Sequence, residues 1–123
     1  MKLRDAQRIV NAEVICGEEF LDREVSCASS ADMMSDVLAF SKENCIVITG
    51  LVNAQVVRTA EMSDAVGILF VRGKRPPPET IELAKLNNMP LLTTKHLMYV
   101  SCGLLFQAGL EGCYMPDEEE NAT

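Results

Sequence analysis

Three apolar runs, each followed by residues at helical spacing, dominate the second half of the chain. The runs cover residues 45–49, 65–71 and 91–93, and apolar runs of this length are typical of strands buried on both faces. Helices are predicted after them, beginning at Asn53, at Pro77 or Pro78, and at Lys95 or His96, with Asn53 and Thr94 as N-caps. Strands that alternate with helices indicate a parallel sheet whose right-handed crossovers place helices on its faces.

The first third of the chain shows a weaker pattern. It predicts a helix ending near Asn11, a strand over residues 12–16, a polar edge strand over 23–28, and a helix over about 32–40 capped by Asp32. The expected fold is therefore three-layer α/β/α, with a small, mostly parallel sheet of about five strands. Residues 1–115 are expected to form one domain, and residues 116–123 an acidic, disordered tail.

Composition narrows the classes of partner. The 123 residues carry a net charge of −7 and are 48% hydrophobic, so attraction to nucleic acid or to an anionic membrane surface is not expected. No apolar run approaches the length of a membrane span, and the first residues lack the apolar centre of a signal peptide. A cytoplasmic location is expected.

The five cysteines are widely spaced and form no C-x-x-C pair, which gives no support for a metal site. We expect buried, reduced thiols that pack as small apolar side chains. The alternative is a redox-sensing thiol at Cys27, which lies in a polar stretch near Arg23.

Candidate ligand-binding residues cluster where the three buried strands end. Ligands of open parallel sheets bind outside the carboxyl ends of the strands, and helix N-termini there favour anions. A nucleotide or phosphometabolite site would use the following side chains and backbone: Asn53, Arg72, Gly73, Lys74, Arg75 and Thr94. Neither a G-x-G-x-x-G nor a P-loop motif is present, so a solvated or interface-forming basic loop is the favoured interpretation.

Catalysis has little support in the sequence. His96 is the only histidine, and it stands beside Lys95 at a predicted helix start, where capping or exposure is the usual explanation. The acidic pairs Glu18 with Glu19, and Asp32 with Asp36, are better explained as surface charge and helix-terminus charge. We therefore expect a protein that is not an enzyme and that uses no cofactor.

The last predicted helix is apolar around most of its circumference. Its apolar residues between positions 97 and 110 face more than one direction, which predicts burial on more than one side. The second cover is either the rest of the core or another subunit, and a homodimer is the simplest such assembly.

Three blocks of the sequence, residues 21–38, 46–61 and 68–77, together resemble the DRTGG domain family. Asp22 and Arg23 match the start of the signature that names the family. Ser26-Cys27-Ala28 stands where Thr-Gly-Gly is expected, and the missing glycines would have allowed positive φ or close backbone approach.

The resemblance implies an α/β/α domain that regulates or dimerises and has no chemistry of its own. Domains of this family resemble the N-terminal domain of HPr kinase/phosphorylase, and they occur in CBS-containing pyrophosphatases and in phosphotransacetylases. For a free-standing domain, the resemblance implies a homodimer with a protein partner in a metabolic or redox system.

Overall fold

A computed structural model describes residues 1–114 and 116 of the chain, so all of the tail predicted for 116–123 except its first residue lies outside the described residues. The elements follow in this order: α1 (Leu3–Ile9), β1 (Glu13–Cys16), the 3-10 turn η1 (Glu18–Phe20), β2 (Cys27–Ser30), α2 (Met34–Phe40), β3 (Cys45–Thr49), α3 (Ala54–Met62), β4 (Gly67–Phe70), α4 (Pro78–Leu86), β5 (Leu91–Thr93) and α5 (Met98–Gln107). None of the helices in this described part is long and apolar enough to cross a membrane.

The strands form a single mixed sheet in the order β1-β5-β4-β3-β2. β2, β3, β4 and β5 pair in parallel, and β1 joins the free edge of β5 in antiparallel orientation. The predicted α/β class with a mostly parallel sheet is confirmed. The 65–71 run contains β4, which is the central strand, with two strands on each side.

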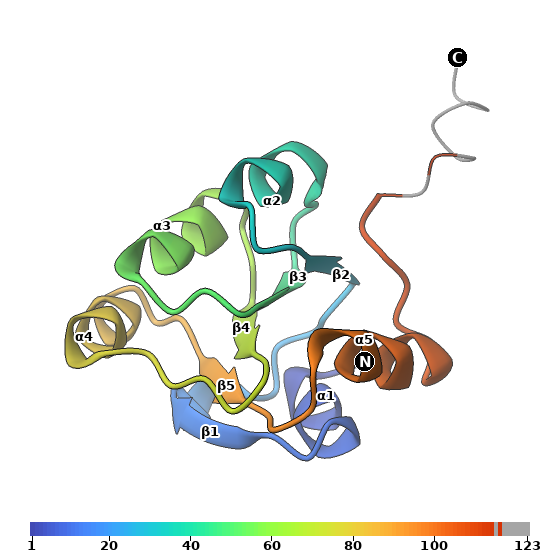
Figure 1. Ribbon diagram of the computed structural model, residues 1–123, viewed down its shortest axis with the longest axis horizontal. Helices are drawn as coiled ribbons and strands as arrows, with labels where there is room; N and C mark the ends of the chain where they lie inside the picture. Colours follow the sequence, from blue (N-terminus) through green and yellow to red (C-terminus); the bar gives the residue numbers. More distant parts are fainter. Residues whose placement is uncertain (115, 117–123) are drawn as a thin grey trace.

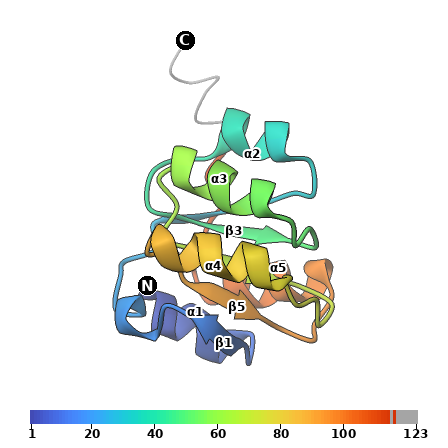
Figure 2. The ribbon, with the colours of Figure 1, turned by 90° about the vertical axis from the view of Figure 1, so that its left-hand side faces the viewer.

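Helices cover both faces of the sheet (Figures 1 and 2). α2, α3 and α4 lie side by side on one face, and α1 and α5 lie on the other. Successive side chains along each strand point to opposite faces of the sheet and pack in two separate cores. Val47 packs with α2, α3 and α4, and its neighbour Ile48 packs with α1 and α5. The continuous apolar runs are thus explained by burial of both sheet faces.

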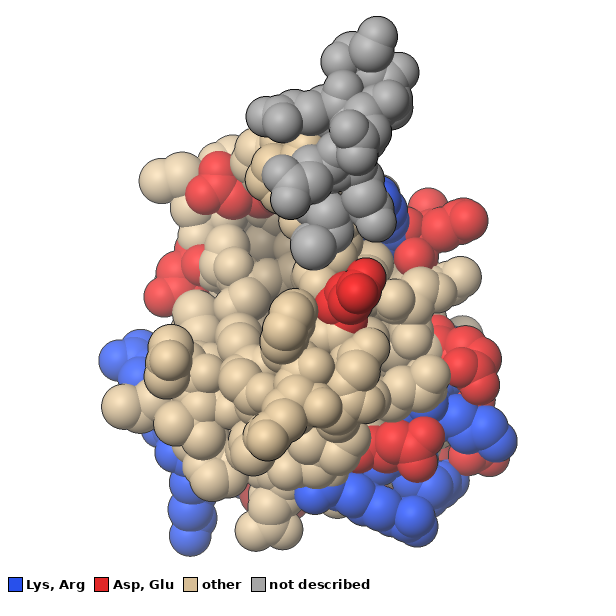
Figure 3. Space-filling model, turned by 90° about the vertical axis from the view of Figure 1, so that its right-hand side faces the viewer, with Lys and Arg blue, Asp and Glu red and all other residues tan. Residues whose placement is uncertain are grey.

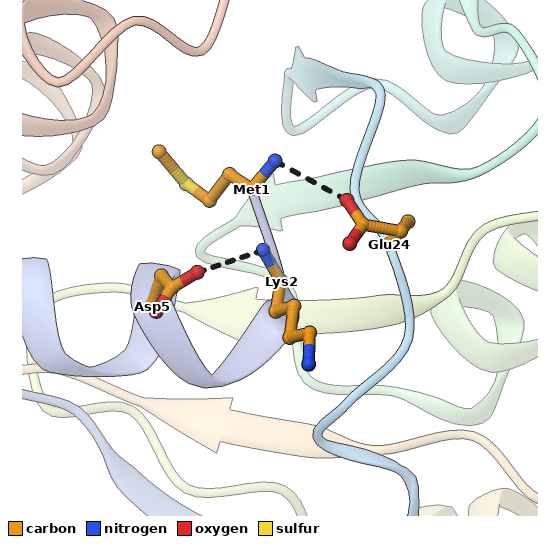
Figure 4. Close-up of polar contacts among 4 residues, drawn as sticks. All are labelled: Met1, Lys2, Asp5 and Glu24. Carbon is orange, nitrogen blue, oxygen red and sulfur yellow. Dashed lines mark hydrogen bonds and ion pairs between the residues drawn. The ribbon is translucent and has the colours of Figure 1, made fainter.

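The strand predicted over residues 23–28 is wrong in its bounds, since β2 begins only at Cys27. The preceding residues pair with the start of the chain instead: the Val25 N–H donates to the Met1 carbonyl at 2.7 Å, and the Leu3 N–H donates to the Arg23 carbonyl at 2.9 Å. Figure 4 shows the side-chain contacts there, with the Met1 ammonium 3.3 Å from the Glu24 carboxylate and the Lys2 N–H donating to Asp5 at 2.9 Å. Residues 23–25 are therefore hydrogen-bonded to the start of the chain and of α1.

Two predicted helix caps are also wrong. Thr94 does not begin α5, because its hydroxyl donates to the Val10 carbonyl at 2.7 Å and the helix begins only after Leu97. Asp32 does not cap α2, because the N-cap residue of that helix is Met33. The Asp32 carboxylate instead accepts hydrogen bonds from the end of β3. Asn53 does occupy the N-cap position of α3, but its side chain makes no capping hydrogen bond.

The expectation of reduced thiols holds for three cysteines and fails for two. Cys27 and Cys113 form a disulfide with their Cα atoms 4.9 Å apart, whereas Cys16, Cys45 and Cys102 are free. Burial raises the pKa of the Cys16 and Cys45 thiols, which keeps both in the unreactive thiol form at neutral pH. The pairing was not predictable because Cys27 and Cys113 are 86 residues apart.

Candidate functional site

The ends of β3, β4 and β5 meet at one edge of the sheet, as their parallel arrangement requires. Backbone hydrogen bonds join the segments that follow these strands: the Arg72 N–H donates to the His96 carbonyl at 2.9 Å, and the Gly73 N–H donates to the Thr94 carbonyl at 2.7 Å. The six predicted ligand-binding residues are thus distributed along this edge. They do not, however, converge on one cavity.

The basic loop after β4 is tied to the protein through its own backbone. Arg72 and Gly73 both adopt left-handed conformations, with φ of 61° and 65°, and a third N–H, that of Lys74, donates to the Val71 carbonyl at 3.2 Å. A phosphate cradle needs free backbone N–H groups directed at the anion. The N–H groups of Arg72, Gly73 and Lys74 are already used, so these three residues offer a ligand only the side chains of Arg72 and Lys74.

The end of β3 carries a carboxylate of its own. One Asp32 oxygen accepts the Gly50 N–H at 2.8 Å and the Thr49 hydroxyl at 3.0 Å. The Arg72 guanidinium lies beside the same glycine, since an added Gly50 Cβ would stand 3.2 Å from its Nη2 atom and 3.5 Å from the Asp32 oxygen. Asp32 therefore places a carboxylate of the protein itself near the Arg72 guanidinium. Sequence analysis missed this role because nothing in the local pattern distinguishes it from a helix cap.

A pocket of about 510 Å³ lies at the end of β5, next to β1. Three of the predicted residues (Gly73, Arg75 and Thr94) line it, while Asn53, Arg72 and Lys74 do not. Arg75 is paired with the Glu13 carboxylate. The exposed side chains of Lys95 and His96 also line the pocket. The pocket is mixed in charge, and it is large enough for a small ligand.

The exposed side of α5 is an apolar surface without charged side chains. We call it the α5 face and define it by Leu97, Tyr99, Val100, Gly103 and Phe106, all of them exposed. Tyr99 is 89% and Phe106 62% exposed, and α5 contains no charged residue. Figure 3 shows a broad area without Lys, Arg, Asp or Glu on this side of the molecule, with charges gathered around it.

An apolar groove of about 340 Å³ runs between α5 and the β2–β3 side of the sheet. Tyr99 and Phe106 form part of its wall on the helix, and Ala28 and Ile48 contribute from the strands. The sequence predicted that α5 would be covered on more than one side, but within this chain only Ser101 and Leu105 of the helix are buried. The second cover is therefore absent from the described part of the chain.

Comparison with protein families gives the affiliation. The model of the DRTGG domain matches residues 5–107. The chain belongs to the DRTGG domain family. That range includes β1 through α5, so the match extends over the sheet and the α5 face alike. No curated protein matches the chain.

A solved structure shares this fold. It is the crystal structure of the CBS and DRTGG domains of the regulatory region of Clostridium perfringens pyrophosphatase, complexed with its activator diadenosine tetraphosphate. The TM-score is 0.66 at 24% sequence identity, and the similarity covers 87% of this chain and 46% of that one. This DRTGG domain chain thus spans about half the length of the regulatory fragment that it resembles.

Proposed function

We propose that this chain is a non-catalytic regulatory or protein-interaction domain that acts as a homodimer through the α5 face. The observation that carries the proposal is an exposed, uncharged helix that the fold itself leaves without a cover. Its family affiliation supports a regulatory role, because the similar pyrophosphatase fragment is a regulatory region in which a DRTGG domain accompanies CBS domains.

The net charge of the chain favours a second copy of it as the partner that covers the α5 face. The chain carries a net charge of −7, so two copies repel each other wherever acidic surfaces approach. The α5 face is where they can meet without placing like charges opposite each other, because α5 carries none. A two-fold axis through the helix would bring the same uncharged residues together from both copies.

The α5 face also supplies part of the area that a dimer interface requires. Aromatic side chains bury roughly 150–250 Å² each, so Tyr99 and Phe106 with Leu97 and Val100 provide on the order of half of the roughly 800 Å² per partner that a standard interface requires. Gly103 lies in the middle of the face, and nothing stands within 4 Å of the position its Cβ would take. A glycine there leaves room for a second helix to approach closely.

The test is the oligomeric state measured by sedimentation velocity. Wild-type protein is expected to be dimeric at micromolar concentration, and Phe106→Asp is expected to be monomeric with an unchanged circular dichroism spectrum. Leu86→Asp is the matched control, since Leu86 is 79% exposed on α4, across the sheet from α5, and it should stay dimeric. A wild-type monomer throughout this concentration range would refute the homodimer.

A second candidate function is a sensor of a nucleotide or other anionic ligand at the carboxyl ends of the strands. The pocket beside Arg75, Lys95 and His96 supports it, and so does the diadenosine tetraphosphate bound by the similar regulatory fragment. The proposed ligand-binding groups remain Asn53, Arg72, Gly73, Lys74, Arg75 and Thr94. Because the N–H groups of Arg72, Gly73 and Lys74 are already engaged, the arginine and lysine side chains would hold the anion.

Thermal shift with a panel of nucleotides, including diadenosine tetraphosphate, tests the sensor. A ligand at a hundredfold excess over its Kd adds about 2.7 kcal/mol of stability, and the shift should vanish in Arg72→Ala/Arg75→Ala. Arg58→Ala is the control, because Arg58 is exposed on α3 outside the pocket. A panel that produces no shift removes this candidate.

A further inference from the structure

The Cys27–Cys113 disulfide fastens the segment after α5 to the edge strand of the sheet. Two backbone hydrogen bonds accompany it: the Ala28 N–H donates to the Glu111 carbonyl, and the Cys113 N–H donates to the Ala28 carbonyl, both at 2.9 Å. Gly112 and Ala28 thereby form an isolated parallel bridge. Beyond the bridge, the Tyr114 ring lies 4.8 Å from the Phe40 ring. Residues 111–114 thus cover the outer edge of β2.

Surface pockets border the disulfide, although both of its residues are buried. A surface pocket of about 320 Å³ is lined by Cys27 and Cys113 together with Lys42, Asn44 and Glu111. A second depression, of about 380 Å³, reaches Cys113 from the side of Phe40 and Tyr114. Thiol–disulfide exchange requires that a thiolate reach one of the sulfurs, and the first pocket provides room for a small one.

The neighbouring thiol does not compete for this bond. Cys45 is the register partner of Cys27 on β3, and both belong to the same buried cluster. Burial raises the pKa of the Cys45 thiol, and the thiolate is the attacking species in exchange. At neutral pH Cys45 is therefore held in the less reactive thiol form, which disfavours a shift of the disulfide to Cys45 and favours two states of the pair, bonded and reduced.

Reduction would change the surface that we assign to the dimer. Leu110 and Gly112 form one end of the apolar groove beside α5, and the disulfide is the covalent bond that holds this end against β2. Without it, only non-covalent contacts hold this end, among them the two backbone hydrogen bonds and the ring contact. An edge strand that loses its cover exposes unpaired backbone groups, and the groove loses its wall at the same time.

We propose that Cys27 and Cys113 form a reversible thiol–disulfide site, reduced by a dithiol, that controls whether residues 111–114 close the edge of β2 and the groove. One thiolate of the dithiol attacks a sulfur of the bond and forms a mixed disulfide, and its second thiolate then displaces the remaining cysteine. The protein gains two protons and two electrons as two thiols, and the dithiol leaves as a disulfide. The effect on dimerisation rests on the proposed homodimer, whereas the exchange itself does not.

The experiment equilibrates the wild-type protein in mixtures of reduced and oxidised dithiothreitol. Alkylation under denaturing conditions should label Cys16, Cys45 and Cys102 in the oxidised protein, and also Cys27 and Cys113 after reduction. Hydrogen exchange of the Ala28 and Cys113 amides should accelerate by about tenfold or more on reduction. Cys113→Ser should reproduce the fast exchange without reductant, and Cys102→Ser, the control, should behave as wild type.

Two results would overturn the inference: Cys27 and Cys113 labelled in the fully oxidised protein, or exchange of the two amides that reduction leaves unchanged. Phe106→Asp separates this inference from the proposed function. A variant that keeps the disulfide chemistry but is monomeric supports both. A wild-type monomer with intact exchange chemistry refutes only the homodimer, and a dimer that reduction leaves unchanged refutes only the control of the groove.

Discussion

Asp32 holds Gly50 by accepting its backbone N–H at 2.8 Å, although the two residues stand 18 positions apart and belong to different loops. The same oxygen accepts the Thr49 hydroxyl at 3.0 Å. This contact joins the segment before α2 to the end of β3, and it places a negative charge near Arg72, one of the side chains that the second candidate function would use.

Replacement of Asp32 by alanine should lower the free energy of unfolding by about 1–3 kcal/mol, because the Gly50 N–H and the Thr49 hydroxyl lose their acceptor. Asp32→Asn should cost less, since an amide oxygen still accepts. Urea denaturation measures both variants. Asp36→Ala is the control: this exposed residue in the first turn of α2 contributes less than about 1 kcal/mol through the helix dipole. Equal losses at the two positions would contradict the assigned role.

Gly17 is the position where a side chain should be tolerated least. Its φ is 83°, and an added Cβ would stand 2.6 Å from the Pro90 Cα, a backbone atom that cannot move aside. We expect Gly17→Ala to lower stability by about 2–5 kcal/mol, through left-handed strain and overpacking together. The denaturation midpoint reports the loss. A change below 1 kcal/mol would show that β1 and the Pro90 turn separate easily.

Gly103→Ala should separate the stability of the fold from that of the dimer. Alanine in an exposed helix interior stabilises a protein by about 0.5–1 kcal/mol relative to glycine, and the site has open space. If a second α5 packs against this position, the dimer should weaken while the monomer becomes more stable. Sedimentation equilibrium and thermal unfolding of dilute protein measure the two effects. An unchanged dimer affinity would place Gly103 outside the interface.

Stability should decline at alkaline pH because of the two buried thiols. Burial raises the pKa of Cys16 and Cys45 above 9.0 in the folded state, so the unfolded chain loses these protons first. Their contribution is complete below the unfolded pKa, and it is lost as the pH rises from there through the raised folded pKa. Denaturation between pH 7 and pH 10.5 measures the slope. Cys45→Ala should flatten it, and an identical slope would exclude Cys45 as a source.

The candidate site was predictable in its location but not in its connections. Parallel strands bring Asn53, Arg72 and Thr94 to one edge of the sheet wherever they occur in sequence, so the edge could be named in advance. The use of the Thr94 hydroxyl by Val10 and the pairing of Arg75 with Glu13 depend on where α1 and β1 pack. Residues more than sixty positions apart carry no local signal of such contacts.

The strand over residues 23–28 shows the limit for weak patterns. Its alternation of polar and apolar residues fits an edge strand, and β2 is indeed at the edge. Met1 and Leu3 nevertheless take the backbone groups of Val25 and Arg23, and this leaves only Cys27–Ser30 to pair with β3. A polar segment has no strong preference of its own, so its partner decides its structure.

The sequence by itself determined the order of strands and helices from Cys45 to the end of α5, because burial on both sheet faces imposes continuous apolar runs and helix packing imposes a period of 3.6. Only the tertiary structure decided that Asp32 binds Gly50, that Cys27 bonds to Cys113 and that the apolar face of α5 stays open. The two bonds join segments distant in the chain, and the exposure of α5 depends on where distant segments pack. Their energies depend on distance and desolvation in the folded state, which no local pattern of residues encodes.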